Sequence, residues 1–119
     1  MKRTRIIGAA VLLGAATCSN SVAGMAAVSG DFLNKACASY VDTPTSTFDG
    51  MCIGYVVGVA SVMEFVNALC LPARSTHAQA VLVVQKYLYE HPEKLHLNAD
   101  ELVFDALQQA FPCAAAPAE

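Results

Sequence analysis

Residues 50–72 read GMCIGYVVGVASVMEFVNALCLP, and this stretch decides the fold of the chain. Between its two cysteines, the plainly polar side chains are only Ser61, Glu64 and Asn67. A segment of this kind is either a membrane span or a helix that its neighbours bury on most sides. An uncharged run must reach about 18 residues to cross a bilayer, and Glu64 interrupts this one earlier. Because a carboxylate is costly inside a bilayer, we predict a buried core helix and no stable membrane insertion.

Two glycines of this stretch, Gly54 and Gly58, lie four residues apart and therefore share one face of the helix. Such a pair is typical of dimerising membrane helices, whereas in a soluble bundle it indicates close packing of a neighbouring helix. We therefore predict that both glycines are packing notches. Glu64 is expected on the one wet edge of the helix, near Asn67.

The start of the chain is typical of a secretory signal peptide. It combines basic residues at 2, 3 and 5, an apolar run over 6–16 and small residues at 21–23. We predict a signal peptide over residues 1–23 with cleavage after Ala23, and Ala26 is the alternative. Export would place the mature protein in the periplasm.

Removal of the signal peptide makes the remaining chain more acidic. Residues 1–23 hold three of the seven Lys and Arg residues and none of the ten acidic ones, so the formal net charge falls from −3 to −6. An acidic domain repels nucleic acid and anionic membrane surfaces. The composition therefore favours a basic or neutral protein partner and disfavours nucleic acid.

Four cysteines remain after cleavage: Cys37, Cys52, Cys70 and Cys113. An even number in an exported chain indicates disulfides, because the compartment is oxidising. Zinc sites need close pairs such as C-x-x-C, which these spacings do not offer. Two disulfides are predicted, and no metal or other cofactor.

The rest of the sequence predicts an all-α domain over residues 31–113, a four-helix up-down bundle with short loops. Residues 24–30 are expected to form a flexible terminus and 114–119 a disordered tail. Asp31 is the predicted cap of the first helix. The second is expected over about 50–69, after a polar loop at 41–49 that Phe48 pins to the core.

The third and fourth helices have clearer boundaries. Thr76 and Gln79 form a capping box for the third helix, which Pro92 ends. Asn98 and Glu101 repeat this pattern before the fourth. The predicted core face of the third helix is Ala80, Val81, Val84, Tyr87 and Leu88, and that of the fourth is Leu102, Val103, Ala106, Leu107, Ala110 and Phe111.

The bundle topology selects one disulfide pairing. Consecutive helices with short loops run antiparallel, which brings Cys37 near Cys52 at one pole and Cys70 near Cys113 at the other. A Cys52–Cys70 bridge is excluded, because that length of helix spans about 27 Å and a disulfide needs Cα atoms within about 7 Å. The remaining alternative would join opposite poles twice. We therefore predict the bridges 37–52 and 70–113.

No residue pattern indicates an enzyme. After removal of residues 1–23, the chain offers no serine elbow, glycine-rich phosphate loop or cysteine left over from the bridges. His91 and His96 flank a short connection with Glu93 and Lys94, but their spacing matches no helix-face metal pair. These four residues are our predicted partner contacts, together with the loop at 41–49, because loops on a rigid scaffold carry recognition.

An ordered set of short motifs resembles the Rap/Tai type of immunity proteins associated with type VI secretion. The resemblance covers residues 32–113, nearly the whole mature chain. Its most specific parts are Gly54-Tyr55-Val56, Gly58-Val59, Cys70-x-Pro72, Val83-Val84, Tyr87-Leu88, His91-Pro92, Ala106-Leu107 and Phe111-Pro112-Cys113.

This resemblance implies a small periplasmic helical protein, often a homodimer, that binds a cell-wall amidase effector and blocks its active-site groove. The composition agrees with export, disulfides and an acidic surface. A second hypothesis from a different class is a structural or accessory periplasmic protein, such as a small chaperone or assembly subunit, with no toxin partner.

Overall fold

Four α-helices form the domain, and the computed structural model describes residues 27–41 and 44–114. The helices are α1 (Gly30–Cys37), α2 (Thr47–Phe65), α3 (His77–Glu90) and α4 (Ala99–Ala110), and a 3-10 helix, η1 (Pro92–Lys94), precedes α4. Within these ranges no strand occurs, although Ser29 and Asn98 form an isolated antiparallel bridge. The predicted all-α fold is confirmed. The signal peptide predicted over 1–23 lies outside the described residues.

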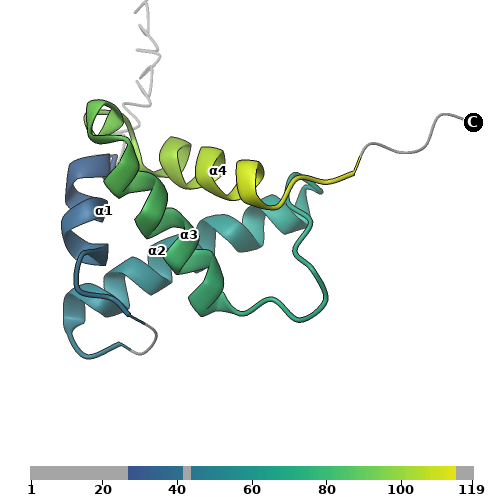
Figure 1. Cartoon of the computed structure of the whole chain (residues 1–119), viewed down its shortest axis with the longest axis horizontal. Coiled ribbons are helices and arrows are strands. Elements are labelled where there is room, and N and C mark those ends of the chain that lie inside the picture. The colour runs from purple at the N-terminus through teal and green to yellow at the C-terminus, as the bar shows by residue number, and fades with distance from the viewer. Residues whose placement is uncertain (1–26, 42–43, 115–119) are drawn as a thin grey trace, which may run out of the picture.

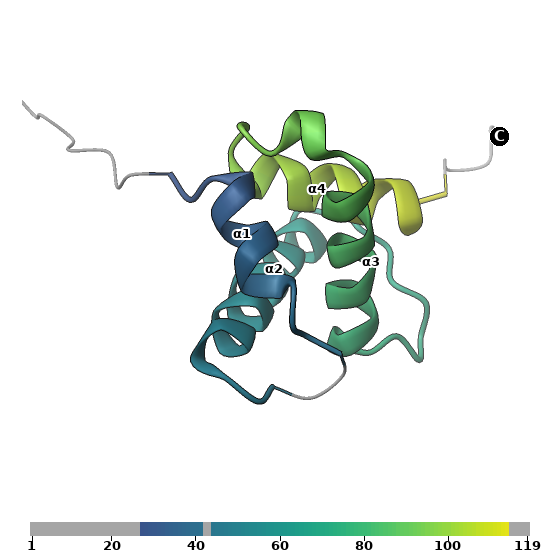
Figure 2. The same ribbon diagram turned by 60° about the vertical axis from the view of Figure 1, so that its left-hand side comes forward.

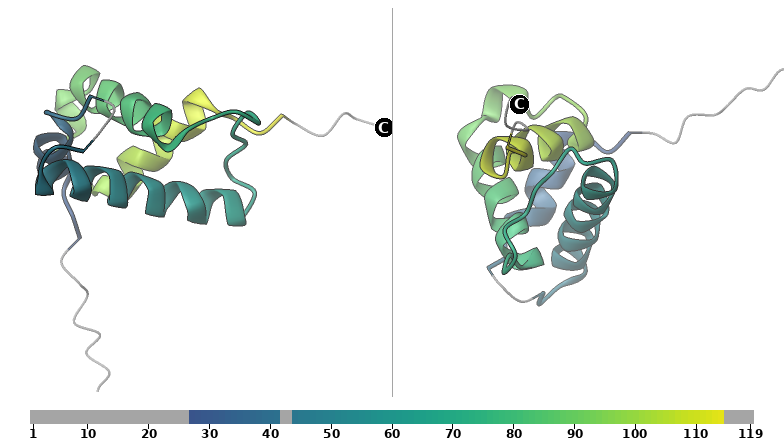
Figure 3. Two further views of the ribbon diagram at one scale, coloured as in Figure 1. Left: turned by 90° about the horizontal axis from the view of Figure 1, so that it is seen from below. Right: turned by 90° about the vertical axis from the view of Figure 1, so that its right-hand side faces the viewer.

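The central helix is α2, which contacts each of the other three. Figure 1 shows α3 crossing in front of α2, with α1 beside the start of α2 and α4 along the top. The turned views in Figures 2 and 3 show that the four axes are strongly inclined to one another. The helices therefore cross around a shared core instead of running alongside each other over their whole length.

All four α-helices contribute to one core. Its large, fully buried aliphatic side chains are Leu33, Leu88, Leu102, Leu107, Val56, Val81, Val84 and Val103. The face predicted for α3 is buried at all five positions. On α4 the prediction fails only at the end, where Ala110 is exposed and Phe111 is half-buried because the helix stops there.

The first two helices begin earlier than predicted. The Ser29 side chain, not Asp31, caps α1 by accepting a hydrogen bond from the Phe32 amide. Ser46 and Asp49 form a capping box that starts α2 at Thr47. Phe48, predicted to pin the preceding loop to the core, lies in the first turn of α2 and is 56% exposed. That prediction is wrong because a helix begins where a loop was expected.

The later caps agree better with prediction. Thr76 and Gln79 form both bonds of the expected capping box. Asn98 does not cap α4 with its side chain, which instead donates a hydrogen bond to Glu101. The backbone amide of Ala99 donates a hydrogen bond to the Val28 carbonyl at 2.7 Å. A neighbouring segment therefore replaces the predicted side-chain cap.

This neighbouring segment belongs to residues predicted to be a flexible terminus. Gly30 and Asp31 donate backbone hydrogen bonds to the carbonyls of Leu97 and Leu95, both at 2.8 Å. A Cβ atom on Gly30 would lie 2.9 Å from the Leu95 carbonyl oxygen, so the close approach of the two backbones requires glycine. The ordered chain thus begins before residue 31.

Both predicted disulfides are present. Cys37–Cys52 joins α1 to α2 with a Cα–Cα distance of 5.0 Å, and Cys70–Cys113 joins the segments after α2 and α4 at 4.8 Å. The first bridge is fully buried, whereas Cys70 is exposed and Cys113 is half-buried. The predicted pairing is confirmed.

The prediction that α2 is buried on most sides is wrong. Only 28% of the most apolar 18-residue window of α2 is buried inside the protein. By length and composition alone, α2 is also long and apolar enough to cross a membrane. Its buried positions, Asp49, Cys52, Val56, Ala60 and Met63, form a single stripe that packs on the other helices. Glu64 is exposed, as expected.

Gly54 and Gly58 of α2 are also not packing notches. Both Gly54 and Gly58 are exposed, and a Cβ atom added to either would meet no atom within 4 Å. The reason is their position around the helix, because at about 100° per residue Gly54 and Gly58 lie almost opposite the buried stripe of α2. The face that carries the glycines is left open.

Candidate protein-binding surfaces

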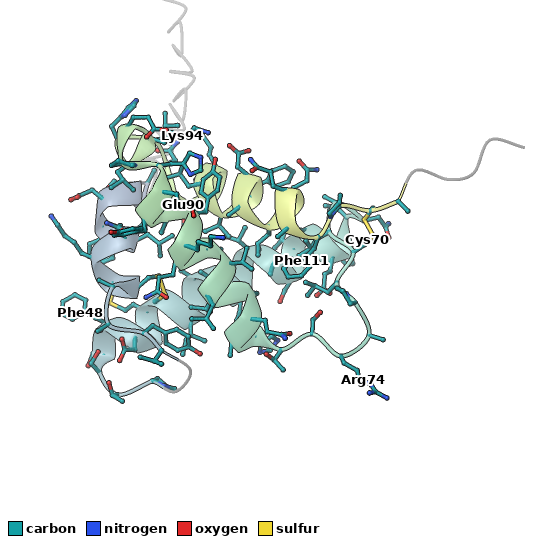
Figure 4. All side chains as sticks on the ribbon, viewed as in Figure 1. Phe48, Cys70, Arg74, Glu90, Lys94 and Phe111 are labelled. Carbon is teal, nitrogen blue, oxygen red and sulfur yellow. A yellow bond between two sulfur atoms is a disulfide. The ribbon has the colours of Figure 1, made fainter. Side chains whose placement is uncertain are left out.

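The predicted contact residues at 91–98 are divided by the structure into an inner and an outer pair. His91 and Lys94 are half-buried, whereas Glu93 and His96 are exposed. The short η1 helix holds them at the end of the molecule opposite the Arg74 loop, as the labelled Lys94 and Arg74 show in Figure 4. Only the outer pair is free to reach a partner without rearrangement.

The inner pair is fixed on Tyr87. The His91 ring stacks on the Tyr87 ring with centroids 4.1 Å apart, and its Nδ1 lies 2.8 Å from the Tyr87 carbonyl oxygen. A carbonyl oxygen only accepts, so Nδ1 carries the proton in this contact. Lys94 Nζ donates to the Tyr87 hydroxyl at 2.9 Å. His91 and Lys94 therefore hold the connection in place.

The charge of Lys94 is stabilised by these neighbours. Its hydrogen bond to the Tyr87 hydroxyl raises the pKa of Lys94, and the carboxylates of Asp105 and Glu93 add to this effect. The Tyr87 hydroxyl in turn donates to Asp105 on α4 at 3.5 Å. This chain of contacts ties η1 to both α3 and α4, so the connection is presented as a rigid unit.

The other predicted contact region, the loop at 41–49, is organised around Asp49. This carboxylate is fully buried and accepts hydrogen bonds from Ser39 Oγ at 2.7 Å and from the amide and hydroxyl of Thr45, both at 2.9 Å. The Ser46 amide adds another at 3.0 Å. These bonds, led by Ser39, hold the pKa of Asp49 well below its usual range.

The end of α1 is fixed by a residue from α3. Gln85 Nε2 donates to the backbone carbonyls of Cys37 at 2.7 Å and Tyr40 at 3.0 Å. The Cys37 carbonyl lies at the end of α1 and also accepts a hydrogen bond from the Tyr40 amide at 3.2 Å. With the buried Cys37–Cys52 bridge and Asp49, the Gln85 contact makes residues 38–41 and 44–49 part of the scaffold. Residues 42–43 lie outside the described ranges.

A third surface was not predicted from the sequence. A groove of about 650 Å³ runs between α2 and α4. Its lining combines apolar residues with three carboxylates: Gly58, Val59, Val62, Met63, Val66, Asp100, Glu101, Phe104 and Asp105. The available signal was the excess of apolar residues on α2, which has more of them than one buried stripe needs.

No metal site accompanies these surfaces. Over residues 27–41 and 44–114, no group of three His, Cys, Asp or Glu side chains is placed to hold an ion. The arrangement offers rigid loops and an open apolar groove, which are features of protein recognition.

The chain matches a known family model, and no curated protein matches it. The family model of Rap1a immunity proteins matches residues 29–113, from the cap of α1 to the last cysteine of the second bridge. Members of an immunity family act by binding a protein effector, which points to a non-catalytic role. The disulfides and the family are consistent with export. Because the match spans the whole four-helix domain, the chain belongs to the Rap1a immunity proteins.

Proposed function

We propose that this protein is a periplasmic immunity protein that binds and inhibits a cell-wall amidase delivered by type VI secretion. The observation that carries the proposal is the family match over residues 29–113, which coincides with the complete helical domain. The predicted signal peptide and the two disulfides support action in the periplasm, where such an amidase reaches its substrate.

The connection between α3 and α4 is the part of the scaffold that we propose to contact the amidase near its active-site groove. Glu93 and His96 are exposed there, and the contacts of His91 and Lys94 with Tyr87 fix the backbone that carries them. A loop that is already ordered loses little conformational entropy on binding, which favours a tight complex. His91 and Lys94 act as positioning residues in this proposal.

The test is co-expression of the full chain with candidate amidases directed to the periplasm. The proposal predicts that the protein restores growth, co-purifies with one amidase and stops its hydrolysis of purified peptidoglycan. If no candidate amidase is bound or inhibited, the inhibitor function is wrong for that set. The accessory-protein hypothesis would then be favoured by co-purification with a non-amidase periplasmic protein.

Charge changes in the connection locate the contact. Glu93→Lys with His96→Glu is expected to weaken amidase binding by about tenfold or more, the effect of losing one well-placed interface residue. Arg74→Glu is the matched control, because Arg74 is exposed in the loop between α2 and α3 at the opposite end (Figure 4). Equal affinities for the two variants would contradict the placement of the contact.

A further inference from the structure

The groove between α2 and α4 is open and is lined mostly by apolar side chains. Val62 and Val66 on its α2 side are 62% and 59% exposed. The neighbouring Phe65 is 87% exposed. Monomeric proteins rarely leave such side chains together in one hollow unless a partner covers them. The groove therefore has the character of an interface core.

Gly58 is the one residue of the groove lining without a side chain. It lies on the α2 wall, and a Cβ atom there would meet no other atom within 4 Å. The missing side chain leaves room for a partner side chain to approach the helix backbone. The α4 wall contributes Phe104, which is half-buried and packs against the hydrophobic core.

The charged residues of the groove all have one sign. Asp100, Glu101 and Asp105 line it, and none of its nine lining residues is basic. Asp100 and Glu101 lie in the first turn of α4, where the helix dipole favours carboxylates and keeps them at this edge. The two described ion pairs, Lys35–Asp31 and Lys86–Glu90, use other carboxylates. Lys94 contacts the Asp105 side chain indirectly, through the Tyr87 hydroxyl.

We propose that this groove binds a segment of the effector in which an apolar side chain is flanked by Lys or Arg. The apolar side chain enters beside Gly58, and the cations pair with the carboxylates of α4. This inference rests on the proposed function and names the chemistry of its partner. A second copy of this chain fits less well, because pairing two such grooves would bring like charges together in an already acidic protein.

The test compares two glycines of the same helix. Gly58→Leu fills the groove, and Gly50→Leu is the matched control, because a Cβ atom at Gly50 also meets no atom within 4 Å. The two positions are about 12 Å apart along the helix axis. Both changes replace a helix-interior glycine by a better helix former, so both variants are expected to fold. Circular dichroism and thermal unfolding check this.

Two probes are used with each variant. The first is the amidase that co-purifies with the wild-type chain. The second is a synthetic peptide that alternates pairs of Leu and Lys, compared with its Leu and Glu counterpart, in a titration followed by amide chemical shifts. We expect Gly58→Leu to weaken both the amidase and the Lys peptide by about tenfold or more, and Gly50→Leu to leave both unchanged. The Lys peptide should shift the amides of residues 58–66 and 100–105, and the Glu peptide should not.

The outcomes separate this inference from the proposed function. If Gly58→Leu binds the amidase as the wild type does, the groove is not the docking site, although the immunity function stands. If the wild type binds no amidase, the proposed function fails. The inference about the groove is then judged by the Lys peptide alone, and it is wrong if that peptide shifts amides outside residues 58–66 and 100–105. A dimer in light scattering that only Gly58→Leu dissociates would identify a second copy as the occupant and also overturn it.

Discussion

The two ends of α2 are fixed in different ways. At its start, Ser46 and Asp49 form a capping box, and the Cys37–Cys52 bridge one turn later is fully buried. At its end, the helix stops at Phe65, the chain turns through Asn67 with a φ of 58°, and the Cys70–Cys113 bridge lies at the surface. The first end is held by buried contacts and the second by a covalent link near solvent.

This difference separates stability from recognition along one helix. At the first end the Asp49 carboxylate and the bridge are both buried, so a partner has little to reach apart from Phe48 and Met51. The second end leaves Phe65 and Val66 exposed beside the α2–α4 groove. Helix α1 covers only the first end because it spans about 12 Å, compared with about 28 Å for α2. Changes at the first end should therefore affect folding alone, whereas changes to the exposed apolar side chains at the second end should affect binding.

The largest expected effect is the loss of a bridge. Loop closure alone assigns about 3 kcal/mol to Cys37–Cys52 and about 4 kcal/mol to Cys70–Cys113, whose sequence separations are 15 and 43. Removal of two buried sulfur atoms adds roughly 1 kcal/mol for each cavity at the first bridge. We therefore expect Cys37→Ala with Cys52→Ala to lower the free energy of unfolding by about 1 kcal/mol more than Cys70→Ala with Cys113→Ala.

Urea unfolding of the two double variants measures this difference. A larger loss of unfolding free energy for the Cys70 and Cys113 variant would show that loop length outweighs burial. The first end of α2 would then not be the more strongly stabilised one.

The bridges should also differ in how readily they are reduced. Cys70 is exposed, whereas Cys37 and Cys52 are inaccessible to solvent. A thiolate must reach a sulfur atom to open a disulfide. Under mild reductant without denaturant, we expect alkylation at Cys70 and Cys113 first, with Cys37–Cys52 intact until the protein unfolds. Mass spectrometry of peptides alkylated at increasing times measures the order, and simultaneous loss of both bridges would contradict the prediction.

The buried carboxylate at the first end gives a smaller effect with a distinctive pH dependence. The folded-state pKa of Asp49 lies below its unfolded value of about 4, so its contribution is complete above that pH and is lost as the pH falls further. Asp49→Asn should therefore lower the thermal midpoint most at neutral pH, and the gap to the wild type should narrow below about pH 4.

Thermal unfolding from neutral to acidic pH measures this gap. Asp31→Asn is the control, because Asp31 forms only an exposed pair with Lys35 and should produce a small gap. A gap for Asp49→Asn that stays constant down to pH 2 would show that the carboxylate charge does not stabilise the fold.

The sequence predicts the parts of this molecule that depend on periodicity and topology. The α3 face and the bridge pairing follow from helical spacing and from antiparallel neighbours. The start of α2 does not, because Ser, Thr and Asp serve equally in loops and caps. Ser46 is an exposed N-cap residue, and its capping-box partner Asp49 is buried, which the sequence spacing alone does not distinguish from a polar loop. The groove depends on how α4 packs beside α2. That is a property of assembled helices, and the glycines of α2 are equally compatible with a covered or an open face.

The second end of α2 offers the smallest predicted effect. Asn67 has a positive φ of 58°, a conformation in which a Cβ atom is unfavourable and Asn is tolerated better than most residues. Asn67→Ala should cost about 1 kcal/mol of unfolding free energy, and Asn67→Gly should be neutral or stabilise by up to about 0.5 kcal/mol.

Ser46→Ala at the other end removes a cap and should cost about 1 kcal/mol. Urea unfolding measures all three, and equal losses for Asn67→Ala and Asn67→Gly would show that the side chain, not the backbone conformation, matters there. A backbone origin would mean that this end of the helix is held by its turn and its bridge, which leaves the adjacent apolar side chains free for a partner.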